Sequence, residues 1–237
     1  MIRSHGELKS VLDALERQGV HCVNATCPNV IRIQELVSKA EQEGRQVIII
    51  GEPHHPEVVG EASWCAHPLI FQGPEELTQW LKGADFDVSV PVTVVAQTTC
   101  IRELFESSCK ILKKQCTNVK IFDTICYATR KRQTEAADIA AKVDVMVVVG
   151  DRKSANTQHL AEICRQNCSR VLQIEGADEL SAADFAGCAL AGLTAGASTP
   201  AGIIKEVKTT MSEEIKATEG MEESFEELLN QSFKTLN

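Results

Sequence analysis

The chain has 237 residues, of which 43% are hydrophobic and only 4% aromatic, and its formal net charge is −9. This length allows one large domain or two modest ones, with a core that is mainly aliphatic. The acidic balance argues against general binding to nucleic acid or to a membrane surface, since both would need a basic face.

The N-terminal segment "MIRSHGELKS" has no apolar core, so it does not resemble a secretory signal. No apolar run approaches the roughly 18 residues of a membrane span. We therefore expect a cytoplasmic protein with no membrane partner. Disulfides rarely persist in that compartment. The ten cysteines are expected to be reactive thiols, metal ligands or, for most of them, small buried side chains.

Short β-rich runs alternate with amphipathic helical stretches along the chain. Continuous apolar strands that alternate with helices predict an α/β fold with parallel sheets covered on both faces. The predicted helices are residues 6–19, 29–44, 101–115, 132–143 and 157–167. The predicted strands are residues 21–25, 46–50, 92–96, 119–123, 143–149, 170–174 and 188–194.

Polar and ionisable side chains follow most of the predicted strands. In parallel sheets, binding sites form where strands end and the next helices begin. Hydroxyl and amide donors beside helix N-termini suit an anion or a phosphate group. One such loop would be ordinary turn and cap chemistry, but a series of them favours a binding site. The segments are "GEPHHPEV", "QTTC", "DTICYATRKRQ", "GDRKSANTQ" and "TAGASTP".

Two cysteines stand out because each follows a predicted strand and precedes a predicted helix. Cys27 lies in "NATCPNV" and Cys126 in "DTICYAT". Neither belongs to a C-x-x-C pair, so a zinc ribbon is a poor interpretation. Cys164 and Cys168 lie four residues apart on a predicted helix, where packing is favoured over metal binding.

Taken in order, "NATCPNV", "GEPHHPEVVG", "QTTC", "DTICYATRKRQ", "GDRKSANTQHL" and "GLTAGASTP" resemble the 4-hydroxy-3-methylbut-2-enyl diphosphate reductases of the LytB family. The resemblance implies a trefoil of similar parallel-sheet α/β units around an iron–sulfur cluster, expected to be [4Fe-4S]. It also implies the last step of the non-mevalonate isoprenoid pathway. In that step two electrons and two protons remove an allylic hydroxyl as water, giving isopentenyl and dimethylallyl diphosphates. Ferredoxin or flavodoxin is the implied electron donor.

The resemblance assigns a ligand or a catalytic role to three residues. Cys27 and Cys126 match two of the family's three cluster cysteines, and thiolates are the standard ligands of such clusters. Glu57 matches the family's proton-delivering acid. Without the "HPEV" motif, Glu57 would be interpreted as a solvated acid at the start of a helix.

Substrate contacts are implied for a second set of residues. Their hydroxyl and amide donors bind diphosphate without salt bridges, which reconciles an acidic protein with an anionic substrate. A lone histidine is more often structural, but the flanking motifs favour a role here. Ala155 departs from the family pattern, because many relatives carry a serine at that position. The residues are His5, His55, Thr98, Ser154, Asn156 and Ser198.

The family's first segment, of the type G-x-C-x-G-V, is not found in this sequence. The third cysteine ligand of the cluster is therefore absent from this chain, with most of the first unit. We expect the chain as given to be inactive, marginally stable or a fragment. The predicted parts are a first-unit remnant (1–27), a second unit (28–121), a third unit (122–197), a return to the first unit (198–210) and an acidic linker and tail (211–237).

The tail has a resemblance of its own. Residues 224–237 resemble the linker to a fused ribosomal-type RNA-binding region, with OB-fold repeats, that some relatives carry. RNA binding would then belong to a possible fused domain that is not present in this chain.

Two other interpretations stay open. A cluster-less diphosphate-binding α/β module, or a decayed enzyme, would fold alone and bind isoprenoid diphosphates without metal. A generic nucleotide- or sugar-phosphate-binding α/β enzyme has less support, because neither G-x-G-x-x-G nor a P-loop is present. It also leaves Cys27 and Cys126 unexplained.

Overall fold

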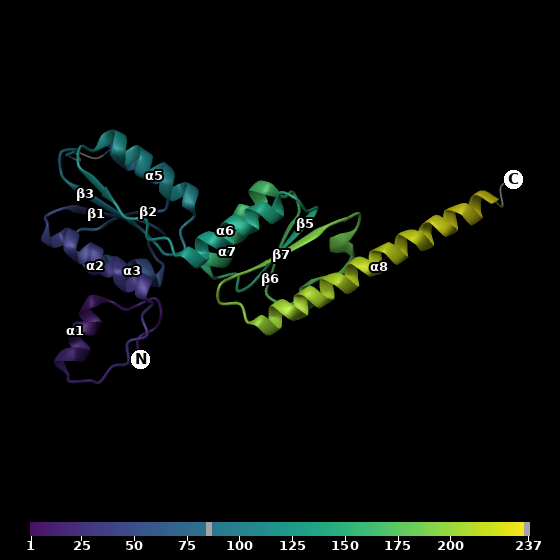
Figure 1. The fold of residues 1–237 in the computed structure, drawn as a ribbon, viewed down its shortest axis with the longest axis horizontal. Helices are drawn as coiled ribbons and strands as arrows, with labels where there is room; N and C mark the ends of the chain where they lie inside the picture. Colours follow the sequence, from purple (N-terminus) through teal and green to yellow (C-terminus); the bar gives the residue numbers. More distant parts are fainter. Residues whose placement is uncertain (84–86, 235–237) are drawn as a thin grey trace. The chain divides into compact units, whose positions relative to one another are not determined.

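The computed structural model describes residues 1–83 and 87–234, with side chains placed over 1–83 and 87–217. The chain forms two compact units, residues 1–130 and residues 131–237. Each unit contains one parallel sheet with helices packed against it (Figure 1). The predicted α/β class with parallel sheets is therefore confirmed.

The sheet of the first unit has four parallel strands in the order β2-β1-β3-β4. Ile48 of β1 pairs with Val94 of β3, so these two strands are direct neighbours. The loops that follow β1 and β3 therefore leave from the same edge of the sheet. The strands are β1 (Gln46–Ile50), β2 (Leu69–Phe71), β3 (Val92–Ala96) and β4 (Val119–Ile121).

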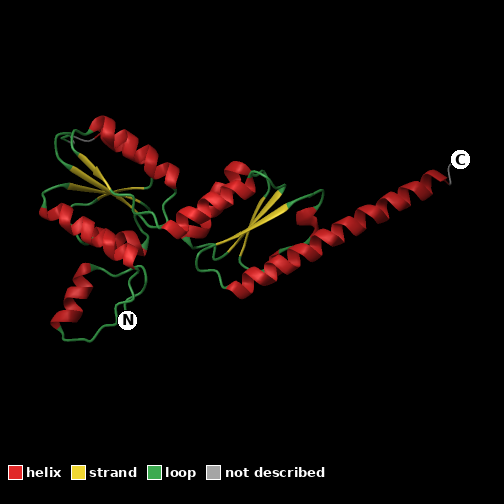
Figure 2. Ribbon diagram, in the orientation of Figure 1, coloured by secondary structure: helices red, strands yellow, loops and turns green. Residues whose placement is uncertain are grey.

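Helices cover both faces of this sheet (Figure 2). Side chains alternate between the faces along a strand. Ile48 and Ile50 pack with Leu112 on one face, and Ile49 packs with Ile33 on the other. The helices are α1 (Lys9–Arg17), α2 (Pro28–Gln42), α3 (Pro56–Ala62), α4 (Pro74–Gly83) and α5 (Arg102–Gln115).

The second unit repeats this plan on a three-stranded parallel sheet of order β6-β5-β7. Val147 and Val149 of the central strand pack toward Val207, whereas Met146 packs toward Leu160. The elements are α6 (Tyr127–Ala140), β5 (Val145–Val149), α7 (Ala155–Asn167), β6 (Val171–Ile174), the short 3₁₀ helices η1 (Ala177–Glu179) and η2 (Ala182–Phe185), β7 (Ala191–Ala195) and α8 (Ala201–Lys234).

Residues 211–223, in the predicted linker, are helical. They continue α8 without a break into residues 224–234. Val207 and Met211 anchor the helix in the core of the second unit. The residues that follow are rich in Glu and contain no proline, so they extend it. Residues 235–237 lie outside the described part. Among the described helices, none is long and apolar enough to cross a membrane.

The other differences from the predicted elements concern short segments. Residues 21–25 form a single bridge, Asn24 with Ile2, in place of a strand. The prediction did not include β2, α3 or α4, which are short or begin at a proline. The predicted second and third units each contain one of the two sheets. The exact boundaries of those units stay a prediction.

We predict that Leu112→Ala lowers the free energy of unfolding of the first unit by about 2–5 kcal/mol, because Leu112 is fully buried and its removal leaves a cavity. Both tryptophans, Trp64 and Trp80, lie in the first unit, so urea unfolding followed by tryptophan fluorescence reports on it. Leu190→Ala is the matched control, since Leu190 is 54% exposed. Equal shifts in the two variants would contradict the described core.

Candidate active site

A buried carboxyl lies where β1 and β3 end. The chain leaves β1, and α3 begins at Pro56, whose fixed φ suits the first position of a helix. Glu57 follows and is only 3% exposed. The Thr98 N–H donates to Glu57 Oε1 at 2.6 Å, and Thr98 Oγ1 donates to Oε2 at 2.8 Å. Two donors from the loop after β3 therefore hold the Glu57 carboxyl in one orientation.

The same threonine also fixes the position of Cys126. The N–H of Cys126 donates to the Thr98 carbonyl oxygen at 3.0 Å. The Asn29 side-chain amide approaches Cys126 Sγ at 3.4 Å. Asn29 lies in the first turn of α2, two residues after Cys27 at the N-cap. The turn that carries Cys27 is therefore adjacent to Cys126, and both thiols are free and half-buried.

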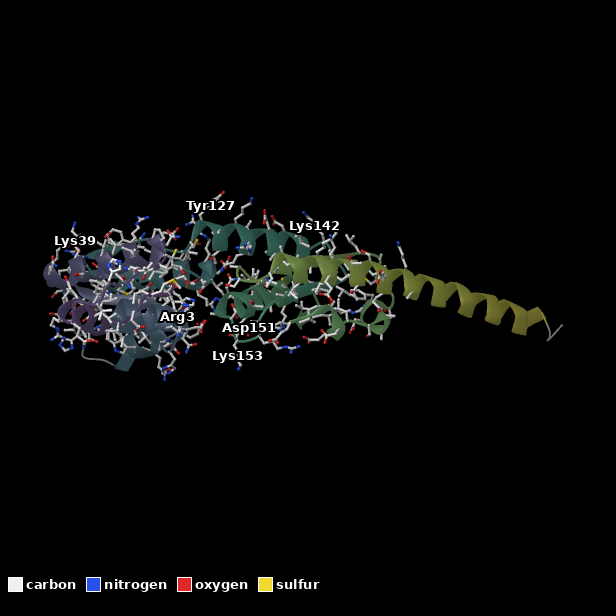
Figure 3. The ribbon with its side chains drawn as sticks, turned by 90° about the horizontal axis from the view of Figure 1, so that it is seen from below. Arg3, Lys39, Tyr127, Lys142, Asp151 and Lys153 are labelled. Atoms are coloured by element: carbon white, nitrogen blue, oxygen red, sulfur yellow. The ribbon has the colours of Figure 1, made fainter. Side chains whose placement is uncertain are left out.

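The loop around Cys126 is open to solvent on one side. Tyr127 is 75% exposed, and its side chain projects away from the ribbon (Figure 3). A pocket lined by Asn29, Arg32, Asp123 and Tyr127 lies beside it, with a volume of about 210 Å³. Small reagents can therefore approach this part of the first unit.

The two predicted substrate histidines meet beside the start of α3. His55 Nδ1 accepts a hydrogen bond from the Glu57 N–H at 3.2 Å and so caps the helix. The ring of His5 meets the His55 ring edge to face, with centroids 5.7 Å apart. His5 also lines a cavity of about 240 Å³ with Arg3, Glu7 and other residues of the N-terminal segment and α3. His5, His55, Glu57, Thr98 and the two cysteines are thus joined by neighbouring contacts in the first unit.

The second unit holds the remaining predicted residues. Ser154 and Ser198 line one cavity of about 130 Å³, together with Thr157 and Thr199. Gly150 is at φ +148°, and a Cβ there would lie 2.7 Å from Thr199 Oγ1. The absence of a side chain at Gly150 therefore leaves room for the Thr199 hydroxyl beside the backbone. Asn156 does not line this cavity. It is buried beside it at the start of α7, and no partner among the described residues reaches its Nδ2.

Most of the other cysteines are packing residues. Burial is the largest of the effects that raise the pKa of Cys100 to about 12. It is also the largest of those that raise the pKa values of Cys65 and Cys164 to about 11. Few such thiols are ionised near neutral pH, so they are poor nucleophiles and poor ligands. Cys164 and Cys168 lie in an apolar cluster with Leu160, in line with the favoured packing interpretation. Among the described residues, no three His, Cys, Asp or Glu side chains gather to hold a metal ion.

Sequence reasoning missed three residues of the first unit. Asn29 donates to a candidate ligand sulfur. Gln97 is fully buried, and its Oε1 accepts from the Glu52 N–H at 3.0 Å, which fixes the loop after β1. Glu61 is a fully buried acid one turn after Glu57. Asn29 could have been found as a polar residue two positions after Cys27, and Glu61 as an acid four positions after Glu57.

Comparison with known proteins agrees with this description. The family model "LytB protein" matches residues 1–212. A 4-hydroxy-3-methylbut-2-enyl diphosphate reductase of Caldanaerobacter subterraneus subsp. tengcongensis is 38% identical over 224 residues, which cover 94% of this chain and 75% of that protein. The solved structure of an (E)-4-hydroxy-3-methyl-but-2-enyl diphosphate reductase matches with TM-score 0.56 and 35% identity, covering 90% of this chain and 75% of that one.

A more distant structure supports the fold alone. The reductase structure from Plasmodium falciparum matches with TM-score 0.79 at 24% identity, over 87% of this chain and 64% of that one. The fold and the site thus define a protein of repeated parallel-sheet α/β units with a polar site at the strand ends. The chain belongs to the LytB family.

We predict that Thr98→Val lowers the free energy of unfolding by about 1.5–3 kcal/mol, the usual contribution of a hydrogen bond to a charged group. The valine keeps the shape of the side chain but leaves Glu57 Oε2 without its hydroxyl donor. Thr117→Val is the matched control, because that hydroxyl is exposed and makes only a 3.5 Å contact. A Thr98→Val variant as stable as the control, by urea titration of tryptophan fluorescence, would show that the hydroxyl does not hold Glu57.

Proposed function

We propose that this chain carries the reductase chemistry named for its relatives, the conversion of 4-hydroxy-3-methylbut-2-enyl diphosphate to isopentenyl and dimethylallyl diphosphates. The observation that carries the proposal is the double role of Thr98. Its N–H and hydroxyl hold the buried acid Glu57, and its carbonyl oxygen binds the N–H of Cys126. A proton donor and a candidate cluster ligand are thereby fixed to one strand end.

The thiols of Cys27 and Cys126 fit two ligand positions of an iron–sulfur cluster, for which we propose the [4Fe-4S] type. Both are free and half-buried, and they come from adjacent segments. The Asn29 N–H directed at Cys126 Sγ is the kind of hydrogen bond that tunes a ligand sulfur. When bound, the cluster would supply the electrons for the reduction. Ferredoxin or flavodoxin is the proposed source of those electrons.

Glu57 is the proposed proton donor to the leaving hydroxyl. The reaction breaks the allylic C–O bond, forms a C–H bond and releases water, so it consumes two electrons and two protons. Protonation of the hydroxyl oxygen by Glu57 turns a poor leaving group into water. Thr98 keeps the carboxyl oriented for this transfer. His5 and His55, which meet beside α3, are the proposed substrate contacts in the same unit.

The diphosphate is proposed to bind to donors of the second unit. Ser154 and Ser198 line the same cavity, and Thr157 and Thr199 add hydroxyls. The buried Nδ2 of Asn156 has no acceptor among the described residues, and buried polar groups normally have one. A phosphate oxygen would satisfy it. These donors are neutral, which suits a chain whose formal net charge is −9.

Cysteine protection tests the cluster ligands without relying on turnover. We expect the product of the complete reading frame that contains these residues to bind iron and sulfide when it is reconstituted anaerobically. We also expect bound iron to slow alkylation of Cys27 and Cys126, as read by mass spectrometry. Cys22, also half-buried and free, is the control and should be alkylated at the same rate with and without iron. Iron binding that leaves Cys27 and Cys126 as reactive as before would contradict their assignment.

Turnover tests the function itself. The product of the complete reading frame that contains these residues should form both diphosphate products under anaerobic conditions with a low-potential reductant. Glu57→Gln should lower kcat about 10²–10⁴-fold, the range for a positioned general acid. Glu16→Gln, an exposed acid on α1, is the matched control. A protein that holds iron and sulfide but does not reduce this substrate would overturn the proposal. Tight binding of isoprenoid diphosphates by the metal-free chain would then favour the cluster-less module.

A further inference from the structure

A second buried carboxyl, Glu61, lies one helical turn beyond Glu57 on α3 and has no part in the proposed reaction. Its side chain is fully buried. No hydrogen-bond donor among the described residues reaches either of its carboxyl oxygens. Residues four apart lie on the same face of a helix, so Glu61 and Glu57 are neighbours.

The surroundings of Glu61 favour its neutral form. Leaving an ionised carboxylate buried without a cation or a donor costs more than keeping the proton. Burial raises the pKa of Glu61 well above its usual range, and the charge of the neighbouring Glu57 raises it further. A proton on Glu61 would have the Glu57 carboxylate as an acceptor one helical turn away.

The segments packed on α3 provide no competing partner. The neutral amide of Gln34, on α2, is 6% exposed, and its Nε2 also has no partner among the described residues. Among the described residues, Glu57 is the charged group that raises the Glu61 pKa. The other ionisable side chains on these segments are Arg3, His5, Glu7 and Lys9 of the N-terminal segment, Arg32, Glu35, Lys39 and Glu41 of α2, and His55 at the start of α3.

The two acids therefore differ in what surrounds them. Glu57 sits in the first helical turn and accepts two hydrogen bonds from Thr98, an arrangement that suits a carboxylate. Glu61 lies in the last turn of α3, where the helix dipole disfavours a negative charge, and no donor among the described residues reaches it. Paired acids whose environments favour opposite protonation states are the usual basis for assigning acid and base roles.

We propose that Glu61 is a positioning residue that stores a proton for Glu57. In the resting protein the Glu61 O–H donates to the Glu57 carboxylate. During reduction the Glu61 O–H bond breaks and an O–H bond forms on Glu57, which then protonates the leaving hydroxyl. Solvent restores the proton to the pair after turnover. This inference rests on the proposed reductase function.

Titration of the chain as it stands tests the shared proton. Infrared difference spectra between the wild-type chain and Glu61→Gln should show the carbonyl band of a protonated carboxyl at neutral pH. In a Glu57→Gln background this band should disappear at a lower pH, because the charge that holds the proton on Glu61 has gone. The proposal would be overturned if Glu61 were ionised at neutral pH. It would also be overturned if Glu61 lost its proton at the same pH with and without the Glu57→Gln substitution.

Unfolding measurements give an independent readout with a defined sign. The pKa of Glu61 is higher in the folded than in the unfolded chain, where it is about 4.3. Its contribution to stability is therefore complete at low pH and falls as the pH rises through the folded value. Glu61→Gln lacks this fall, so its stability relative to the wild type should rise with pH. A difference that does not vary with pH would also overturn the proposal.

Kinetics separate this inference from the proposed function. In the anaerobic assay, Glu61→Gln should lower kcat about 10-fold or more, which is a smaller effect than the loss of Glu57 itself. KM should not change, and the decrease in kcat should be greatest at alkaline pH. Glu61→Asp, which keeps an acid there, should restore part of the rate. If Glu61→Gln had the same kcat as the wild type at every pH, the proposed proton store would be wrong, but the proposed reductase function would stand. A wild-type protein without turnover would overturn both.

Discussion

The site of the first unit depends on the loop after β3, because Thr98 in this loop makes hydrogen bonds through three different groups. Its N–H and hydroxyl bind the Glu57 carboxyl, and its carbonyl oxygen accepts the Cys126 N–H. β1 and β3 are adjacent and parallel, so the acid after one strand reaches donors after the other. A displacement of this loop would therefore move the proposed proton donor and a candidate cluster ligand together.

The same helix holds two acids in contrasting environments. The first turn of α3 places Glu57 beside donors, whereas the next turn buries Glu61 with no donor among the described residues, and burial raises its pKa well above the usual range. In the proposed mechanism, the position of each carboxyl on the helix decides which of the two stores the proton. The donors proposed for the diphosphate in the second unit differ from this pair, since they are neutral hydroxyls and an amide and would bind without charge.

The sequence predicted the features that depend on local patterns. The apolar runs at 46–50 and 92–96 became the neighbouring strands β1 and β3, and the polar loops after them met as parallel strands require. Contacts between distant segments could not be predicted this way. Asn29 and Cys126 are 97 positions apart, and no periodicity relates them. Burial of Glu61 was also hidden, because an acid inside a polar segment ordinarily faces solvent.

The most direct measurement of the central claim is the anomalous scattering of iron in a crystal of the anaerobically reconstituted protein, recorded at the iron absorption edge. The account predicts an iron peak within bonding distance of the sulfur atoms of both Cys27 and Cys126, with the Glu57 carboxyl facing it and still bound to Thr98. A peak at other cysteines, or a Glu57 carboxyl turned away from the iron, would contradict it.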